Sequence, residues 1–292
     1  MSTLALPELT DRIVEKARSL GASTAGIADV RVLKQSPSHR IYPKIGMDPE
    51  LRWQDAPQAA LHHEVEWPAD AASVVVIGVE HPADQPELDW YDGKGTPGNR
   101  ILIRIVGELS VWLEETLAIR SHRPPYFIES RGIFLKDSAA LAGLGRIGRN
   151  NLVITPEYGP RVRWRALLLD HPAEATGPLD FDPCHACDQP CRTACPVGAF
   201  DRTVYSSSEL GQSLLPGIDG TYDRVTCNTK MARDVDDAAR SMALSDREGE
   251  AVASMMNRFE EVVMAMPERS GGAGYGVRYC RRCELSCPIG RR

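Results

Sequence analysis

The cysteines are the feature that most constrains this chain. All eight lie between Cys184 and Cys287, in two dense groups with the single Cys227 between them. The N-terminus shows no secretion signal, so this usage does not suit a secreted disulfide scaffold. In such a chain, crowded cysteines indicate a metal or cluster site instead.

The spacing within the groups predicts iron-sulfur clusters. The first group reads Cys184-His-Ala-Cys187-Asp-Gln-Pro-Cys191-Arg-Thr-Ala-Cys195-Pro196, which is close to the C-x2-C-x2-C-x3-C-P run of bacterial two-cluster ferredoxins, with one spacing longer by a residue. The last group reads Cys280-Arg-Arg-Cys283-Glu-Leu-Ser-Cys287-Pro288. Each 4Fe-4S cubane takes four thiolates, so eight cysteines suit two clusters with none left over.

Because the Cys before Pro ligates the other cluster in the ferredoxin pattern, we predict crossed ligation. The first cluster takes Cys184, Cys187, Cys191 and Cys287, and the second takes Cys195, Cys227, Cys280 and Cys283. Structural zinc and free or disulfide-bonded thiols are the alternatives, but zinc needs only paired C-x2-C units and does not explain two Cys-Pro endings. Such clusters carry electrons and say nothing about a substrate, so the chemistry must lie upstream.

The composition is that of an ordinary globular protein. The whole chain has 292 residues, 42% of them hydrophobic and 25% charged, which suits two compact domains. Apolar residues at helical spacing predict a helix over 9–20, with Thr10 or Asp11 as its cap and Gly21 ending it, and 101–119 is a second helical candidate of mixed period. Residues 25–28 read as a short strand, and 73–79 as a buried strand rich in branched residues. This alternation predicts an α/β layer up to about Asp170, and we place domains at 1–172 and 173–292.

Other segments carry weaker signals. The stretches 31–67 and 82–99 read as irregular loops that shape a substrate pocket, and 234–266 reads as one or two helices whose methionine-rich stripe packs into a core. No apolar run approaches the ~20 residues that a membrane helix needs. A net charge of -6 disfavours a broad nucleic-acid surface. With no export signal visible, we expect a cytoplasmic protein.

A glycine-dense turn stands before the second half of the chain. It reads Gly143-Leu-Gly145-Arg-Ile-Gly148-Arg-Asn-Asn, with two cations and two amides among three glycines. It resembles a phosphate cradle but does not match G-x-G-x-x-G.

Together these motifs resemble the epoxyqueuosine reductases and their relatives, the reductive dehalogenases. Tyr126-Phe-Ile-Glu129-Ser130 and the glycine turn through Asn150 are similar to that family's "F-V-D-S/T … A-G-L-G-W-x-G-K-N" block. The segment Tyr222-Asp-Arg-Val-Thr-Cys227 is similar to its "L-D-x-x-R-C", and the last cysteine group to its "G-C-D-D-C-Q-x-x-C-P" ending.

The resemblance implies a nitroreductase-like α/β domain that binds cobalamin, followed by a ferredoxin-like domain with two 4Fe-4S clusters. An external low-potential donor, of ferredoxin or flavodoxin type, would supply electrons. Glu129 matches the family's proposed proton donor, an Asp, and a carboxyl in a desolvated pocket can act as an acid. The residues expected to bind the cofactor are Ser130, Arg131, Gly143, Gly145, Arg146, Gly148, Arg149 and Asn150.

The sequence also departs from the family. The epoxyqueuosine reductases continue into a helical-repeat region that helps to hold tRNA, whereas this chain stops at Arg292. We therefore expect a cobalamin-dependent reductase of a small molecule, with Glu129 or a tyrosine such as Tyr91 or Tyr126 as the acid. An electron-transfer or corrinoid-activating protein and a tRNA-acting epoxyqueuosine reductase are the alternatives.

Overall fold

A four-stranded sheet in the order β1-β2-β7-β4 forms the centre of the protein. The computed structural model describes residues 5–45, 64–91, 96–241, 277–278 and 280–290. All three strand pairs are antiparallel, and Val75 of the central strand β2 lies opposite Ile27 on one side and Leu167 on the other. The strands are β1 (Thr24–Asp29), β2 (Ser73–Glu80), β4 (Ser121–His122) and β7 (Val162–Leu169).

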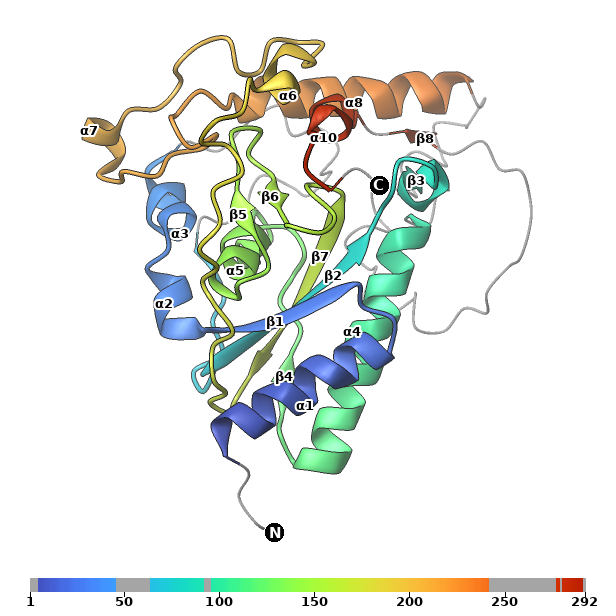
Figure 1. The fold of residues 1–292 in the computed structure, drawn as a ribbon, viewed down its shortest axis with the longest axis vertical. Helices are drawn as coiled ribbons and strands as arrows, with labels where there is room; N and C mark the ends of the chain where they lie inside the picture. Colours follow the sequence, from blue (N-terminus) through green and yellow to red (C-terminus); the bar gives the residue numbers. More distant parts are fainter. Residues whose placement is uncertain (1–4, 46–63, 92–95, 242–276, 279, 291–292) are drawn as a thin grey trace.

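Helices cover both faces of this sheet (Figure 1). The helices α1 (Leu6–Ser19) and α4 (Pro97–Leu117) contribute to the core on one face. The helices α2 (Val30–Lys34) and α5 (Leu135–Leu141) pack on the other. Alternate side chains of a strand point to opposite faces. Val75 and Ile77 accordingly enter the first core and Val74 and Val76 the second.

The predicted strands over 25–28 and 73–79 and both predicted helices are confirmed, but the first helix begins earlier than expected. Its N-cap is Ala5, and Pro7 occupies its first turn, where the missing N–H of proline costs nothing. The predicted caps at Thr10 and Asp11 are wrong. Thr10 is buried, and its hydroxyl donates to the Glu174 carbonyl at 2.8 Å.

The two segments predicted as irregular contain ordered elements. The stretch after β1 holds α2, α3 (Pro37–Ile41) and the 3-10 turn η1 (Tyr42–Lys44), and its residues 46–63 lie outside the described residues. The second stretch holds η3 (Pro86–Asp89) and β3 (Trp90–Tyr91) and gives way to α4 at Pro97. Short helices of about one turn escape periodicity because they contain too few residues to repeat a pattern.

The cysteine-rich half gathers at one end of the sheet (Figure 1). Its helices are α6 (Pro190–Thr193), α7 (Ser207–Leu210), α8 (Arg224–Ser241) and α10 (Arg282–Ser286). Two short antiparallel pairs complete the topology, β5 (Arg146–Ile147) with β6 (Val153–Ile154), and β3 with β8 (Val277–Arg278). The helix α8 covers the start of the stretch predicted over 234–266, and the methionine-rich stripe lies outside the described residues.

A membrane-spanning helix was not expected from the sequence. Among the helices of the described ranges, none has the length and apolar content needed to cross a bilayer.

Candidate functional site

The cysteines occupy the helices and turns of the region above the sheet. Cys191 lies on α6, Cys227 on α8 and Cys283 on α10, and the helices α6 and α10 pack against each other. All eight are free thiols, so the structure gives the disulfide alternative no support.

Four of these thiols influence one another from short range. Burial, together with the nearby Cys287 and Cys184, raises the pKa of Cys191 to about 11. The pKa of Cys287 is also raised, first by burial and then by Cys184 and Cys187. These neighbours are the four residues that the sequence spacing assigns to one cluster.

The remaining four form a second set. Burial and the neighbouring Cys227 raise the pKa of Cys283 to about 12, with a further contribution from Cys280. Burial raises the pKa of Cys227, and Cys195 and Cys280 add to the effect. Cys191 of the first set also acts on Cys283, so the two sets adjoin.

Neither set is arranged for a single metal ion. Within the described ranges, no three His, Cys, Asp or Glu side chains converge closely enough to hold one. Thiolates are the donors that 4Fe-4S cubanes take, four to each, so the eight thiols supply the donor chemistry of two cubanes.

A tyrosine and a lysine stand beside the second set. The Tyr222 hydroxyl is hydrogen-bonded to Cys227, and this bond opposes the rise that burial causes in the pKa of that thiol. The ammonium group of Lys136 donates to the Asn151 carbonyl at 2.7 Å and lies 5.9 Å from the Tyr222 ring centre. Because the ammonium group is buried, the pKa of Lys136 is lowered.

Glu129, the predicted acid, is buried with 3% of its surface exposed. Its carboxylate forms an ion pair with Arg224, the first residue of α8. Arg224 precedes Cys227 by less than one helical turn, so this contact joins the predicted acid to the second cysteine set. Arg131, which the resemblance places among the cofactor-binding residues, is exposed and has a positive φ of 71°.

A second candidate acid, Tyr42, was missed by the sequence reasoning. Its side chain is buried and packs edge to face against Phe134, with ring centres 5.4 Å apart. Burial raises the pKa of Tyr42, whereas the positive charge of Arg224 acts to lower it. Because Tyr42 lies in a stretch read as irregular and far from Arg224 in sequence, no spacing signal could link them.

The glycine turn is a tightly packed hairpin between α5 and β6. A Cβ on Gly145 would come within 2.3 Å of the Ile154 carbonyl oxygen, and one on Gly148 would meet the Ile154 side chain at the same distance. Gly143 has a φ of 69° and lies against the Thr176 backbone. The close approach that these glycines permit is therefore to the chain itself.

The polar residues of this turn have partners in the cysteine-rich half. Arg146 pairs with Asp182 at 2.9 Å, and Arg149 pairs with Asp219 at 3.1 Å. Two nitrogens nevertheless stay buried without a hydrogen-bond partner, Nε of Arg149 and Nδ2 of Asn150. Both can donate to an oxygen of a bound group.

The other predicted residues surround Glu129 in the sequence. The Ser130 amide donates to the Phe127 carbonyl at 3.0 Å, within the same tight turn. Tyr126 is exposed, and the Arg165 guanidinium stacks on its ring at 4.1 Å. The side chain of Tyr91 lies outside the described residues.

Comparison with known proteins gives relatives of one kind. The epoxyqueuosine reductase of Synechococcus sp. is 30% identical over 214 residues, which are 68% of this chain and 64% of that protein. That of Gloeobacter violaceus is 27% identical and is covered over 60% of its length. The chain thus spans less than two thirds of these relatives. No family model matches the chain.

Solved structures agree on the fold. A selenomethionine-labelled epoxyqueuosine reductase superposes with a TM-score of 0.53 at 18% identity, covering 97% of this chain and 65% of that one. A reductive dehalogenase described with a mechanism for B12-dependent dehalogenation superposes with a TM-score of 0.52 at 17% identity, covering 90% and 36%.

The fold and the site define a mixed α/β protein that ends in a cysteine-rich region carrying two sets of thiols. The chain is a distant relative of the epoxyqueuosine reductases, and its fold is similar to those of an epoxyqueuosine reductase and a reductive dehalogenase.

Proposed function

We propose that this protein is an iron-sulfur reductase that uses cobalamin to reduce a small molecule. The observation that carries the proposal is the division of eight free thiols into two adjoining sets of four. That arrangement suits a two-cluster electron relay in a ferredoxin-like region, beside a nitroreductase-like domain. Contacts with the α/β domain extend slightly past residue 172, where we place the domain boundary. The Thr176 hydroxyl donates to the Ala142 carbonyl at 2.6 Å.

Cobalamin would lie against the glycine turn. The buried, unpartnered nitrogens of Arg149 and Asn150 suit amide or phosphate oxygens of such a group. When bound, the clusters would supply one-electron transfer from an external low-potential donor, and the corrinoid would supply the reducing chemistry at the substrate.

The protein's own contribution is to hold and supply a proton. The Arg224 guanidinium favours the ionised form of Glu129, so this carboxylate orients Arg224 and accepts hydrogen bonds in the resting protein. Burial raises the pKa of Tyr42 and keeps its phenol protonated near neutral pH. Tyr42 is therefore the group that holds a proton beside Arg224, and Glu129 must first take up a proton before it can pass one to a substrate.

The test is anaerobic reconstitution with iron, sulfide and cobalamin, followed by desalting and absorption and EPR spectra. We expect about eight irons per chain and a retained base-off cobalt(II) signal. Glu129→Gln and Tyr42→Phe should retain both while slowing substrate reduction, and Glu115→Gln, on the exposed face of α4, is the matched control. About eight irons per chain without retained corrinoid would contradict the proposed reductase function.

A second function is favoured by the Glu129–Arg224 ion pair, since a carboxylate so paired is not a ready acid. In this case the chain passes electrons to the corrinoid of a partner protein and needs no acid of its own. Unchanged reduction of a partner corrinoid in Glu129→Gln, with no turnover of small substrates, would support this function. Binding of tRNA at low salt would instead support the third alternative, a tRNA-acting reductase.

A further inference from the structure

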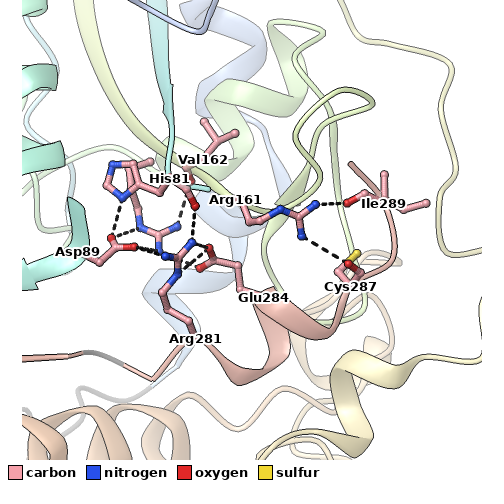
Figure 2. A network of polar contacts seen from close by, with 9 residues as sticks. His81, Asp89, Arg161, Val162, Arg281, Glu284, Cys287 and Ile289 are labelled. Carbon is pink, nitrogen blue, oxygen red and sulfur yellow. Dashed lines mark hydrogen bonds and ion pairs between the residues drawn. The ribbon is translucent and has the colours of Figure 1, made fainter. Parts of the chain in front are cut away.

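A buried network of charges joins the α/β body to the last cysteine helix (Figure 2). Asp89 accepts from His81 Nδ1 at 2.8 Å and pairs with Arg281 at 2.9 Å. From strand β7, Arg163 reaches Asp89 at 3.1 Å and Glu284 at 2.8 Å. Arg281 Nε also donates to Glu284 at 2.9 Å, so each carboxylate is held by both arginines.

The charges of this network balance. Burial lowers the pKa of His81, which leaves its ring neutral. Burial works against ionisation of Asp89, but the His81 hydrogen bond and the charges of Arg163 and Arg281 bring the pKa of this carboxyl to about 2. Two guanidinium groups thus face two carboxylates, and removing one partner would leave an uncompensated buried charge.

Glu284 occupies a particular place in the sequence of α10. It lies between Cys283 and Cys287, which fall in different cysteine sets, and it is 4% exposed. The helix therefore carries a proposed ligand of one cluster, Cys283, and the residue that caps its C-terminus, Cys287, is a proposed ligand of the other. After the helix, Arg161 donates to the carbonyl oxygens of Cys287, at 3.4 Å, and Ile289 (Figure 2).

The chain beyond Cys287 fits the body closely. A Cβ on Gly290 would lie 2.2 Å from the Gly159 nitrogen, and one on Gly159 would lie 2.0 Å from the Ile289 carbonyl oxygen. Arg161 and these two glycines fix the segment after α10, while Arg163 and Arg281 fix the helix itself. The helix is thus held at both of its ends.

We propose that Arg163 and Glu284 are positioning residues for electron transfer, which anchor α10 so that the two clusters keep a fixed separation and orientation. This inference rests on the proposed function, because it takes the two cysteine sets as cluster ligands. Outer groups that orient ligands in this way typically change metal affinity 10–100-fold when they are lost. Hydrophobic residues of similar volume can replace a buried ion network without loss of stability. A role in orienting α10 explains why charged residues, and not hydrophobic ones, occupy these positions.

The experiment compares variants of the full chain after anaerobic reconstitution. Glu284→Gln keeps the shape and removes one charge, and Arg163→Lys keeps the charge and removes the fork that reaches two carboxylates at once. Arg120→Met is the matched control, because Arg120 is 73% exposed and its ion pairs with Asp70 and Asp170 lie on the surface. Each sample is reduced with dithionite, which supplies one electron to each cluster.

The readouts are iron content, the spin–spin interaction between the two reduced clusters in the EPR spectrum, and the rate of iron loss to a chelator. We expect Glu284→Gln and Arg163→Lys to retain about eight irons, with an altered interaction spectrum and about tenfold faster iron loss. Arg120→Met should match the unsubstituted protein.

Two failures can be told apart. If the unsubstituted chain fails to hold about eight irons, the proposed function is wrong, and the positioning role that rests on it is wrong as well. If all samples hold their irons but Glu284→Gln and Arg163→Lys give the same interaction spectrum as Arg120→Met, the positioning role is overturned while the proposed function stands. Faster extraction by the chelator of the iron bound by the set with Cys283 than of the remaining iron would support the anchoring role.

Discussion

His39 shows how one residue can couple the fold to pH. Its Nε2 accepts from the Phe134 amide at 3.3 Å, so Nε2 carries no proton and Nδ1 is the nitrogen that donates to the Ser36 hydroxyl, 2.9 Å away. The ring also packs edge to face on Phe134. Burial lowers the pKa of His39 to about 4. The imidazole is therefore built into the fold in its neutral form, at the N-terminus of α5.

This arrangement predicts a loss of stability in mild acid. The unfolded chain takes up a proton below about pH 6.5, whereas folded His39 stays neutral down to about pH 4. The stabilising contribution of neutral His39 is complete above the pKa of the unfolded chain, about 6.5. It is lost as the pH falls from this value toward the folded pKa of about 4. Between about pH 7.5 and about pH 5 we expect the free energy of unfolding to drop by about 2 kcal/mol.

Guanidinium denaturation followed by circular dichroism at several pH values would measure this slope. His39→Gln should flatten it, and substitution of the exposed His122 should leave it unchanged. An equal slope in His39→Gln and the unsubstituted protein would show that other groups cause the pH dependence.

At the scale of elements, the core is formed by the apolar faces of a few helices and strands. On α4, Leu109 is fully buried against the sheet, whereas Val111, two residues further on, is 49% exposed. Leu109→Ala should lower the free energy of unfolding by about 3 kcal/mol, because it removes buried methyl groups and leaves a cavity. Val111→Ala should change it by less than about 0.5 kcal/mol.

Both variants would be measured by chemical denaturation under the same conditions. Helix propensities of Leu, Val and Ala differ by less than about 0.7 kcal/mol, so a difference of about 3 kcal/mol between the variants reports burial. Similar losses in the two variants would mean that α4 does not pack on the sheet as described.

How far the sequence could predict these elements depends on the range of the interactions involved. The strand over 73–79 was predictable as a short continuous run of branched apolar residues, and the helix over 101–119 as a longer apolar segment of mixed period. The cysteines were found from their fixed local spacing, and Glu129 from the resemblance to the family's F-V-D block. Arg163, Asp89 and Glu284 were not found, since their contacts join residues 74 and 121 positions apart. Isolated charges carry no periodic signal, so only the fold could bring them together.

At the scale of the whole molecule, the two halves of the cysteine pattern are interleaved. Cys287, the C-cap of α10, acts on the pKa of Cys191, nearly a hundred residues earlier, while Cys283, within α10, responds to Cys227. Burial raises the pKa of each of these thiols, so binding iron must compensate for the cost of forming buried thiolates. The C-terminal segment is thus shared between both proposed clusters.

This sharing predicts which substitutions have the same effect. Cys287→Ala should remove the same cluster as Cys184→Ala, and Cys283→Ala the same cluster as Cys227→Ala, each leaving about four of about eight irons. The EPR spectra of the singly loaded proteins would identify the surviving cluster, because two cubanes in different surroundings differ in their signals. If Cys283→Ala and Cys287→Ala instead lose the same cluster, the last cysteine group serves one cubane alone. Ligation is then not crossed, and α10 does not bridge the two centres.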